Sequence, residues 1–147
     1  MQSQLVFCVV IVILAVVSAG SLPLKDCGSK AGKVTSISLD PPPVGSCTFP
    51  RGKNVTATLN LEIDEATSKL TVKCKGDVVV WVNFPLPNND ACSQGVTCPT
   101  TSGSSYTFKT VIPILHEYPS LRLVVQLEFQ DDNGQDAICV QFPGEIC

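Results

Sequence analysis

The chain is poor in the residues on which catalysis and nucleic-acid binding depend. Its 147 residues include one histidine, His116, and no Gly-x-Ser-x-Gly segment that would present a nucleophilic serine. Only 10 lysines and arginines stand against 13 aspartates and glutamates, which gives a net charge of −3. Nucleic-acid binding requires clustered Lys and Arg. We therefore expect no nucleic-acid partner, no enzyme activity and no cofactor; a hydrolase dependent on His116 is the least favoured interpretation.

A run long enough to span a membrane is also missing. The unbroken apolar segment from Leu5 to Val17 is shorter than the roughly 20 residues that a transmembrane helix needs. An apolar segment of about 7–15 residues followed by small residues, here Ser18 and Ala19, is typical of a secretory signal peptide. We predict a signal peptide over residues 1–19, cleaved after Ala19 or, alternatively, after Gly20. A membrane anchor is the competing interpretation.

Residues 20–147 carry every charged side chain and contain no further apolar run of spanning length. A segment of this size forms one domain and buries roughly two-thirds of its unfolded surface. We therefore expect a single soluble domain over residues 20–147, secreted into an oxidising compartment.

Alternation of apolar and polar residues dominates this domain. It is clearest over residues 54–63, and it recurs over residues 121–129 with Val124 as the one exception. Such alternation is typical of strands with one dry and one wet face. In the first segment the dry face holds Val55, Ala57, Leu59, Leu61 and Ile63.

Weaker strand patterns separated by turn residues complete the domain. They cover residues 33–39, 70–75, 78–84, 105–114 and 138–142. Asn133-Gly134, between two apolar strands, favours a hairpin, because this pair readily takes positive φ. No segment has a sustained helical period. The pattern predicts an all-β fold, an antiparallel β-sandwich of about seven strands.

The cysteines indicate a disulfide framework with one thiol left over. Cys92 and Cys98 bracket a turn and form either a small disulfide loop or a pair of metal ligands. Because zinc sites pair such a motif with a second ligand pair, which this chain lacks, we favour the disulfide and expect no metal. Cys27 and Cys139, near opposite ends of the domain, are able to link its first strand to its last.

Removal of the leader would take away Cys8 and leave an odd number of cysteines. Cys47, Cys74 and Cys147 then remain, and three thiols cannot all pair within one chain. We prefer Cys47 with Cys147, leaving Cys74, although the sequence alone does not decide the pairing.

Four segments, in order and spacing, resemble one family. Residues 25–29 begin the domain, and Phe84-Pro85-Leu86-Pro87 leads to Cys92 and Cys98. Residues 117–120 precede the strand at 121, and residues 130–133 precede Cys139. Together they are similar to the ML lipid-recognition domain over essentially all of residues 20–147. The resemblance implies an immunoglobulin-like β-sandwich whose sheets part around a lipid, with disulfides Cys27–Cys139 and Cys92–Cys98.

The resemblance also implies a set of lipid-binding residues. By position, the pocket mouth would be formed by Phe84, Ile114 and Tyr118. The interior would be lined by Val82, Ile112, Leu121, Leu123 and Val125. This chain departs from the family in three places: Pro42 replaces the usual partner of Cys47, Leu127 and Val140 replace two tryptophans, and residues 73–77 and Trp81 differ from the usual segment.

The function implied is carriage of a sterol or another apolar lipid. We expect such a carrier to be a monomer that contacts membranes transiently and passes its lipid to a membrane-protein acceptor. It would act outside the cell or in the lysosomal lumen. The alternative is extracellular lipid recognition, in innate immunity or as a carrier of chemical signals. Asn54 begins an Asn-Val-Thr glycosylation sequon on the wet face of its strand. His116 is expected to be a solvated loop residue or, alternatively, a group whose charge alters the pocket mouth.

Overall fold

The structure is a computed structural model that describes residues 22–147. The predicted signal peptide, residues 1–19, lies outside the described residues. Within residues 22–147, no helix combines the length and the apolar character that crossing a membrane requires.

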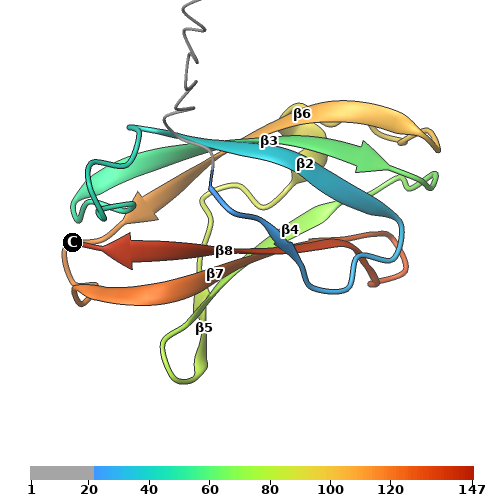
Figure 1. Ribbon diagram of the computed structural model, residues 1–147. Coiled ribbons are helices and arrows are strands. Elements are labelled where there is room, and N and C mark those ends of the chain that lie inside the picture. The colour runs from blue at the N-terminus through green and yellow to red at the C-terminus, as the bar shows by residue number, and fades with distance from the viewer. Residues whose placement is uncertain (1–21) are drawn as a thin grey trace, which may run out of the picture.

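Two antiparallel sheets stacked face to face form the domain (Figure 1). The three-stranded sheet has the order β2 (Gly32–Asp40), β3 (Lys53–Ile63), β6 (Ser104–Ile114). The five-stranded sheet has the order β1 (Lys25–Asp26), β8 (Asp136–Ile146), β7 (Leu121–Gln130), β4 (Thr71–Asp77), β5 (Trp81–Phe84). A short 3₁₀ turn, η1 (Ala91–Ser93), precedes β6. The predicted all-β, immunoglobulin-like sandwich is confirmed, with the short β1 as an additional strand.

The alternation in the sequence builds the core between the sheets. The five dry-face residues of β3 are at most 1% exposed, and Leu127 and Phe129 of β7 are fully buried. Phe108 of β6 meets Phe129 edge to face across the sandwich, with ring centroids 5.1 Å apart. Because successive side chains of a strand point to opposite faces, each strand contributes every second residue to this core.

Two strand boundaries differ from those predicted by more than two residues. β8 continues to Ile146, beyond the predicted end at residue 142, although Pro143 and Gly144 normally weaken a strand pattern. β5 is shorter than predicted because residues 78–80 form the turn between β4 and β5. In that turn the Val79 amide donates to the Asp77 carboxylate at 3.1 Å, and the Val78 amide donates to the Val80 carbonyl at 3.1 Å.

Glu128 is buried, although it falls on the polar face of the alternation over residues 121–129. It lies on the outer face of β7 as expected, but it is only 6% exposed. The Lys75 ammonium donates to its carboxylate at 3.0 Å, and the Gln126 amide donates to it at 2.6 Å. These neighbours satisfy the charge and cover it.

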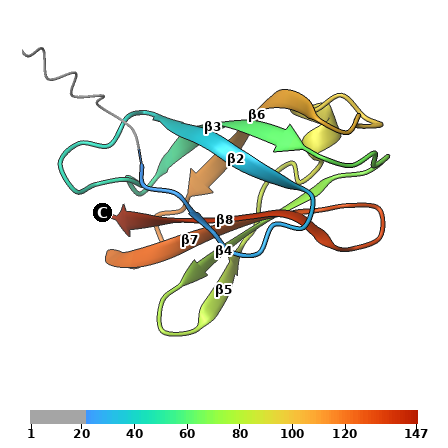
Figure 2. The same cartoon turned by 45° about the vertical axis from the view of Figure 1, so that its right-hand side comes forward.

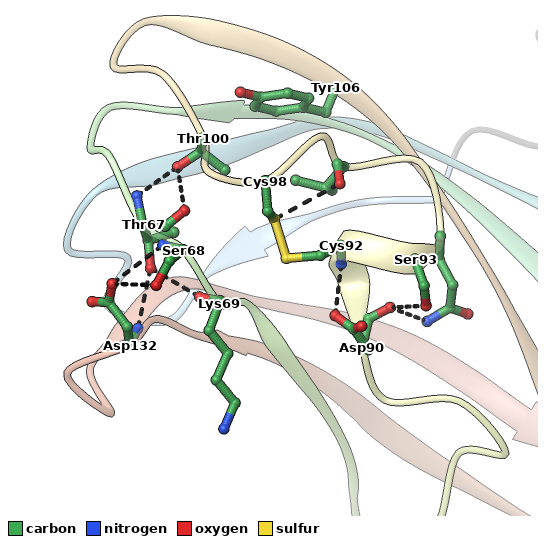
Figure 3. The surroundings of a disulfide bond; sticks show 12 residues. Thr67, Ser68, Lys69, Asp90, Cys92, Ser93, Cys98, Thr100, Tyr106 and Asp132 are labelled. Carbon is green, nitrogen blue, oxygen red and sulfur yellow. Dashed lines mark hydrogen bonds between the residues drawn. A yellow bond between two sulfur atoms is a disulfide. The ribbon is translucent and has the colours of Figure 1, made fainter.

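The domain contains three disulfides: Cys27–Cys139, Cys47–Cys147 and Cys92–Cys98. They include the two pairs that the family resemblance implied and the Cys47–Cys147 pair that we preferred. Cys74 is a free, buried thiol. Figure 3 shows Cys92–Cys98 closing the η1 loop, where the Asp90 carboxylate accepts the Cys92 amide at 2.9 Å. Among residues 22–147, no group of three or more His, Cys, Asp or Glu side chains is placed to hold a metal ion.

Candidate functional site

An apolar pocket lies between the two sheets, at the end where β6 stops and β7 begins. The strands β4 to β8 supply most of its wall, and the loops before β3 and after β6 supply the remainder. The lining residues are Phe49, Cys74, Phe84, Ile112, Ile114, Tyr118, Leu123, Val125 and Ile146. None of these side chains carries a charge, so an apolar guest would leave no ion unpaired inside the protein.

The pocket is narrow in this structure. The cavity volume open to the centre of a water molecule is about 20 Å³. Sites for small molecules have volumes of roughly 300–1,000 Å³. The pocket therefore has room for about one water molecule as it stands, and the sheets must separate before it can hold a sterol.

Two aromatic side chains form the rim. The rings of Phe84 and Tyr118 meet edge to face with centroids 5.3 Å apart. Phe84 is the last residue of β5 and pairs with Cys74 of β4. A methyl group at Gly76, two residues further along β4, would overlap the Phe84 ring and lie 2.8 Å from Leu123 Cδ1. The absence of a side chain at Gly76 therefore allows the Phe84 ring to fold over the pocket.

A third aromatic ring closes the opposite wall. Phe49 is 3% exposed and packs at 6.5 Å, tilted, against Phe142. Its ring lies over Gly144, where an added Cβ would approach Phe49 Cε2 to 2.6 Å. Phe49 forms a bridge to Ile146 at the end of β8, so the Cys47–Cys147 disulfide fixes both residues beside the pocket.

The polar atoms of the lining are neutral. Burial raises the pKa of the Cys74 thiol to about 12. Burial also raises the pKa of Tyr118, with smaller contributions from Cys74 and from the charge of Glu117. A thiol needs to lose its proton before it acts as a nucleophile. At physiological pH the pocket therefore provides a binding surface without an activated nucleophile.

The structure brings together six of the eight predicted lipid-binding residues. They are Phe84, Ile112, Ile114, Tyr118, Leu123 and Val125. The other two do not line the pocket: Val82 is 39% exposed on β5, and Leu121 is half-buried at the start of β7. Val82 pairs with Gly76, which places it nearer than Phe84 to the tip of the β4–β5 hairpin.

Sequence reasoning missed Phe49, Cys74 and Ile146. Cys74 could have been found, because it shares the inward period-two face of Val72. Phe49 lies in an irregular loop, and Ile146 follows Pro143 and Gly144, so neither residue belongs to a clear alternating pattern.

Neither of the other two predicted positions lines the pocket. Asn54 is exposed near the start of β3, opposite Pro113 of β6, and its glycosylation stays a prediction. His116 is exposed in the loop after β6, and its ring lies against Gly52. This placement agrees with a solvated loop residue.

The turn of the β4–β5 hairpin extends beyond the rest of the five-stranded sheet (Figure 2), and the residues at its tip are apolar. The exposed fractions are 99% for Val79, 65% for Val80 and 49% for Trp81. The same hairpin carries Phe84 at its base, on the pocket rim. Contiguous exposed apolar residues on a protein of this size mark an interaction surface.

Comparison with known proteins gives a consistent result. The chain matches the ML domain over residues 21–146. It is 34% identical over 135 residues to the NPC intracellular cholesterol transporter 2 homolog a of Drosophila melanogaster, covering 89% of this chain and 91% of the relative. It is 32% identical over 143 residues to the NPC intracellular cholesterol transporter 2 of Mus musculus, covering 92% and 94%.

A solved structure shares the fold. The crystal structure of a Niemann-Pick type C2 protein from the Japanese carpenter ant superposes with a TM-score of 0.77 at 24% identity, covering 85% of this chain and 99% of that chain.

Proposed function

Because this chain belongs to the ML domain family, we propose that it is a lipid carrier that shields a sterol, or a similar apolar lipid, between its two sheets and transfers it between membranes. The observation that carries the proposal is the apolar, uncharged pocket closed by Phe84 and Tyr118. The names of the relatives support a sterol as the ligand. Such a pocket suits the binding and release of a lipid rather than catalysis.

The size of a sterol sets the expected affinity. With about 28 heavy atoms, at roughly −0.3 kcal/mol per atom, binding would be worth about −8 kcal/mol, which corresponds to a Kd near micromolar. Separating the sheets uses part of this energy. An affinity in this range protects the lipid from water and still allows release at a bilayer.

We further propose that the β4–β5 hairpin makes the transient membrane contact. Trp81 and the exposed valines at its tip have the chemistry of residues that settle at a bilayer interface. Since Phe84 lies at the base of the same hairpin, insertion of the tip would bring the pocket rim to the membrane surface. A membrane-protein acceptor is the alternative recipient of the lipid.

The site of action follows from the same proposal. Residues 1–19 would direct the chain into the secretory pathway, and the three disulfides suit an oxidising compartment. We place the carrier outside the cell or in the lysosomal lumen, as a monomer.

A transfer assay tests the function. Donor vesicles containing a fluorescent sterol are mixed with acceptor vesicles, and the rate of transfer is measured with and without the protein. Phe84→Ala and Tyr118→Ala should each raise the sterol Kd about tenfold, because each removes an aromatic contact from the rim. Val111→Ala, on the outward face of β6, is the matched control and should leave the Kd unchanged.

One result would contradict the proposed pocket mouth, and another would contradict the carrier function. Equal sterol affinity in wild type and both rim variants would show that Phe84 and Tyr118 do not form the pocket mouth. Tight binding of lipopolysaccharide with no sterol transfer would instead support the recognition function.

A further inference from the structure

Thr110 carries a buried hydroxyl without a hydrogen-bond partner. It lies on β6 with its side chain on the inward face, between Phe108 and Ile112, and is 2% exposed. Its Oγ1 makes no hydrogen bond in the structure. A hydroxyl withdrawn from water without a partner destabilises a protein, so such groups are uncommon in native structures.

The position of Thr110 connects this hydroxyl to the pocket. Ile112, the next inward residue of β6, lines the pocket, and residues two apart on a strand are about 7 Å apart. Thr110 is thus one step deeper into the sandwich along the same strand. Its partner on β3 is Ala57, whose small side chain leaves space beside the hydroxyl.

The side chains beside Thr110 in its own sheet offer neither its hydroxyl nor a bridging water a hydrogen-bond partner. A buried water normally makes two to four hydrogen bonds, and the neighbours of Thr110 on its own face and on β3 are Phe108, Ile112 and Ala57, which offer no polar side-chain atom. Valine has nearly the same shape, suits a strand equally well and would bury no polar atom. A ligand that enters beyond Ile112 would supply the missing hydrogen bond.

We propose that Thr110 is a specificity-determining residue whose hydroxyl binds an oxygen at the leading end of the lipid. This inference rests on the proposed carrier function and narrows its ligand class. As the sheets part, a guest that passes Phe84 and Tyr118 advances along β6 and meets Thr110 beyond Ile112. The preferred cargo is then a lipid with a polar atom at both ends, such as a sterol that bears a hydroxyl on its side chain.

The two ends of such a lipid would have different partners. Cys74 and Tyr118 carry the side-chain hydrogen-bonding groups among the residues that line the pocket, and Tyr118 lies at the rim. The trailing hydroxyl of the lipid would therefore remain near Tyr118 and solvent, and the leading hydroxyl would reach Thr110.

Competition binding tests the assignment. The secreted protein is loaded with a fluorescent sterol, which is displaced by cholesterol or by 25-hydroxycholesterol, and the ratio of the two Kd values is determined. Wild type should prefer the hydroxylated sterol about tenfold, and Thr110→Val should lower this preference to about one without weakening cholesterol binding. Thr110→Ser keeps the hydroxyl and should keep the preference.

Thr107→Val is the matched control, because Thr107 lies on the outward face of the same strand and its hydroxyl donates to Asn60 at 3.1 Å. This variant should keep the wild-type ratio. Thr110→Val should also unfold at the wild-type temperature or above, since it removes an unsatisfied polar atom. An unchanged ratio in Thr110→Val would overturn the inference and leave the carrier function standing. Failure of the wild type to bind either sterol would overturn both.

Discussion

Gly76 determines how tightly the pocket rim can close. Its missing side chain gives the Phe84 ring its place over β4, and Gly144 does the same for Phe49 on the opposite wall. We predict that Gly76→Ala displaces the Phe84 ring and lowers the free energy of unfolding by about 1–3 kcal/mol, the usual effect of overpacking. Urea unfolding measures the loss, and stopped-flow sterol dissociation should show faster release.

Phe84→Leu provides the control for this interpretation. In the double variant with Gly76→Ala, the leucine at position 84 is smaller than the phenylalanine ring that the new methyl group would overlap. The two changes should therefore be less than additive in unfolding free energy. Full additivity would mean that Gly76 acts on something other than the Phe84 ring.

Glu65 gives the protein a dependence on pH. Burial, a hydrogen bond with Asp131 and the negative charges of Asp131 and Asp132 raise the pKa of Glu65. The folded state thus favours the protonated carboxyl. Its contribution to stability is fully present below the ordinary glutamate pKa of about 4.3 and is lost as the pH rises through the raised value.

Two aspartates act in the opposite direction. Hydrogen bonds from Ser29 and Gly28 lower the pKa of Asp26, and hydrogen bonds from Ser68 and Thr67 lower the pKa of Asp132. Their contributions are present above the ordinary aspartate pKa of about 3.9 and are lost as the pH falls through the lowered values. On these three groups alone, stability is lost both as the pH falls below the ordinary aspartate pKa and as it rises through the raised pKa of Glu65.

Glu65→Gln tests the glutamate alone. We predict that the variant loses less stability than wild type between weakly acidic and neutral pH, because glutamine does not ionise. Urea unfolding at several pH values measures the two slopes, with Glu62→Gln on the exposed face of β3 as the control. Parallel slopes in wild type and Glu65→Gln would show that Glu65 does not titrate in this range.

At the scale of elements, the β4–β5 hairpin combines strain with exposure. Val79 has φ of 93°, a conformation that β-branched residues rarely adopt, and its side chain is 99% exposed. A strained and exposed valine contributes nothing to the core. This supports the proposal that the tip serves an external contact.

A substitution at the hairpin tip should therefore change stability and membrane contact in opposite directions. We predict that Val79→Gly raises the free energy of unfolding by about 1 kcal/mol, because glycine accepts positive φ, and weakens vesicle association. Trp81 is the one tryptophan of the chain, so its fluorescence reports the contact directly. The sterol Kd in solution should not change. Stronger vesicle binding by Val79→Gly would argue against the hairpin as the contact.

Some strands and turns could be predicted from the sequence and others could not. β3 and β7 were predictable because one face of each is dry along its whole length. The turn at residues 78–80 was not, because three valines carry strong strand propensity and no turn signal; the Asp77 hydrogen bond that forms the turn is visible only in the structure. The rim residues Phe84 and Tyr118 were predicted from the family resemblance, since alternation alone cannot separate a pocket from a packed core.

At the scale of the whole molecule, the Cys47–Cys147 disulfide links fold stability to the pocket. It joins residues 100 positions apart and fixes Phe49 and Ile146 beside the cavity. We predict that replacing both cysteines with serine lowers the free energy of unfolding by about 2–5 kcal/mol and weakens sterol binding. Denaturant unfolding and the competition assay measure the two effects.

The Cys92–Cys98 disulfide supplies the comparison. It closes a loop with a sequence separation of 6, in a region that contributes no residue to the pocket lining. Its removal should cost less stability, because a shorter loop restricts the unfolded chain less, and should leave sterol affinity at the wild-type value. Equal loss of affinity in both double variants would indicate a general effect of unfolding.

The two flanks of the sandwich are held together by different forces. On one flank, the Cys47–Cys147 bond and the amides of Thr48 and Phe49, which both donate to the Glu145 carbonyl, fasten the loop before β3 to β8. On the other flank, Tyr118 and Phe84 meet through their rings. A covalent bond and hydrogen bonds thus hold the edge at Cys47–Cys147, whereas only van der Waals contact between two rings holds the edge at Phe84 and Tyr118. We therefore expect lipid to enter and leave between Phe84 and Tyr118.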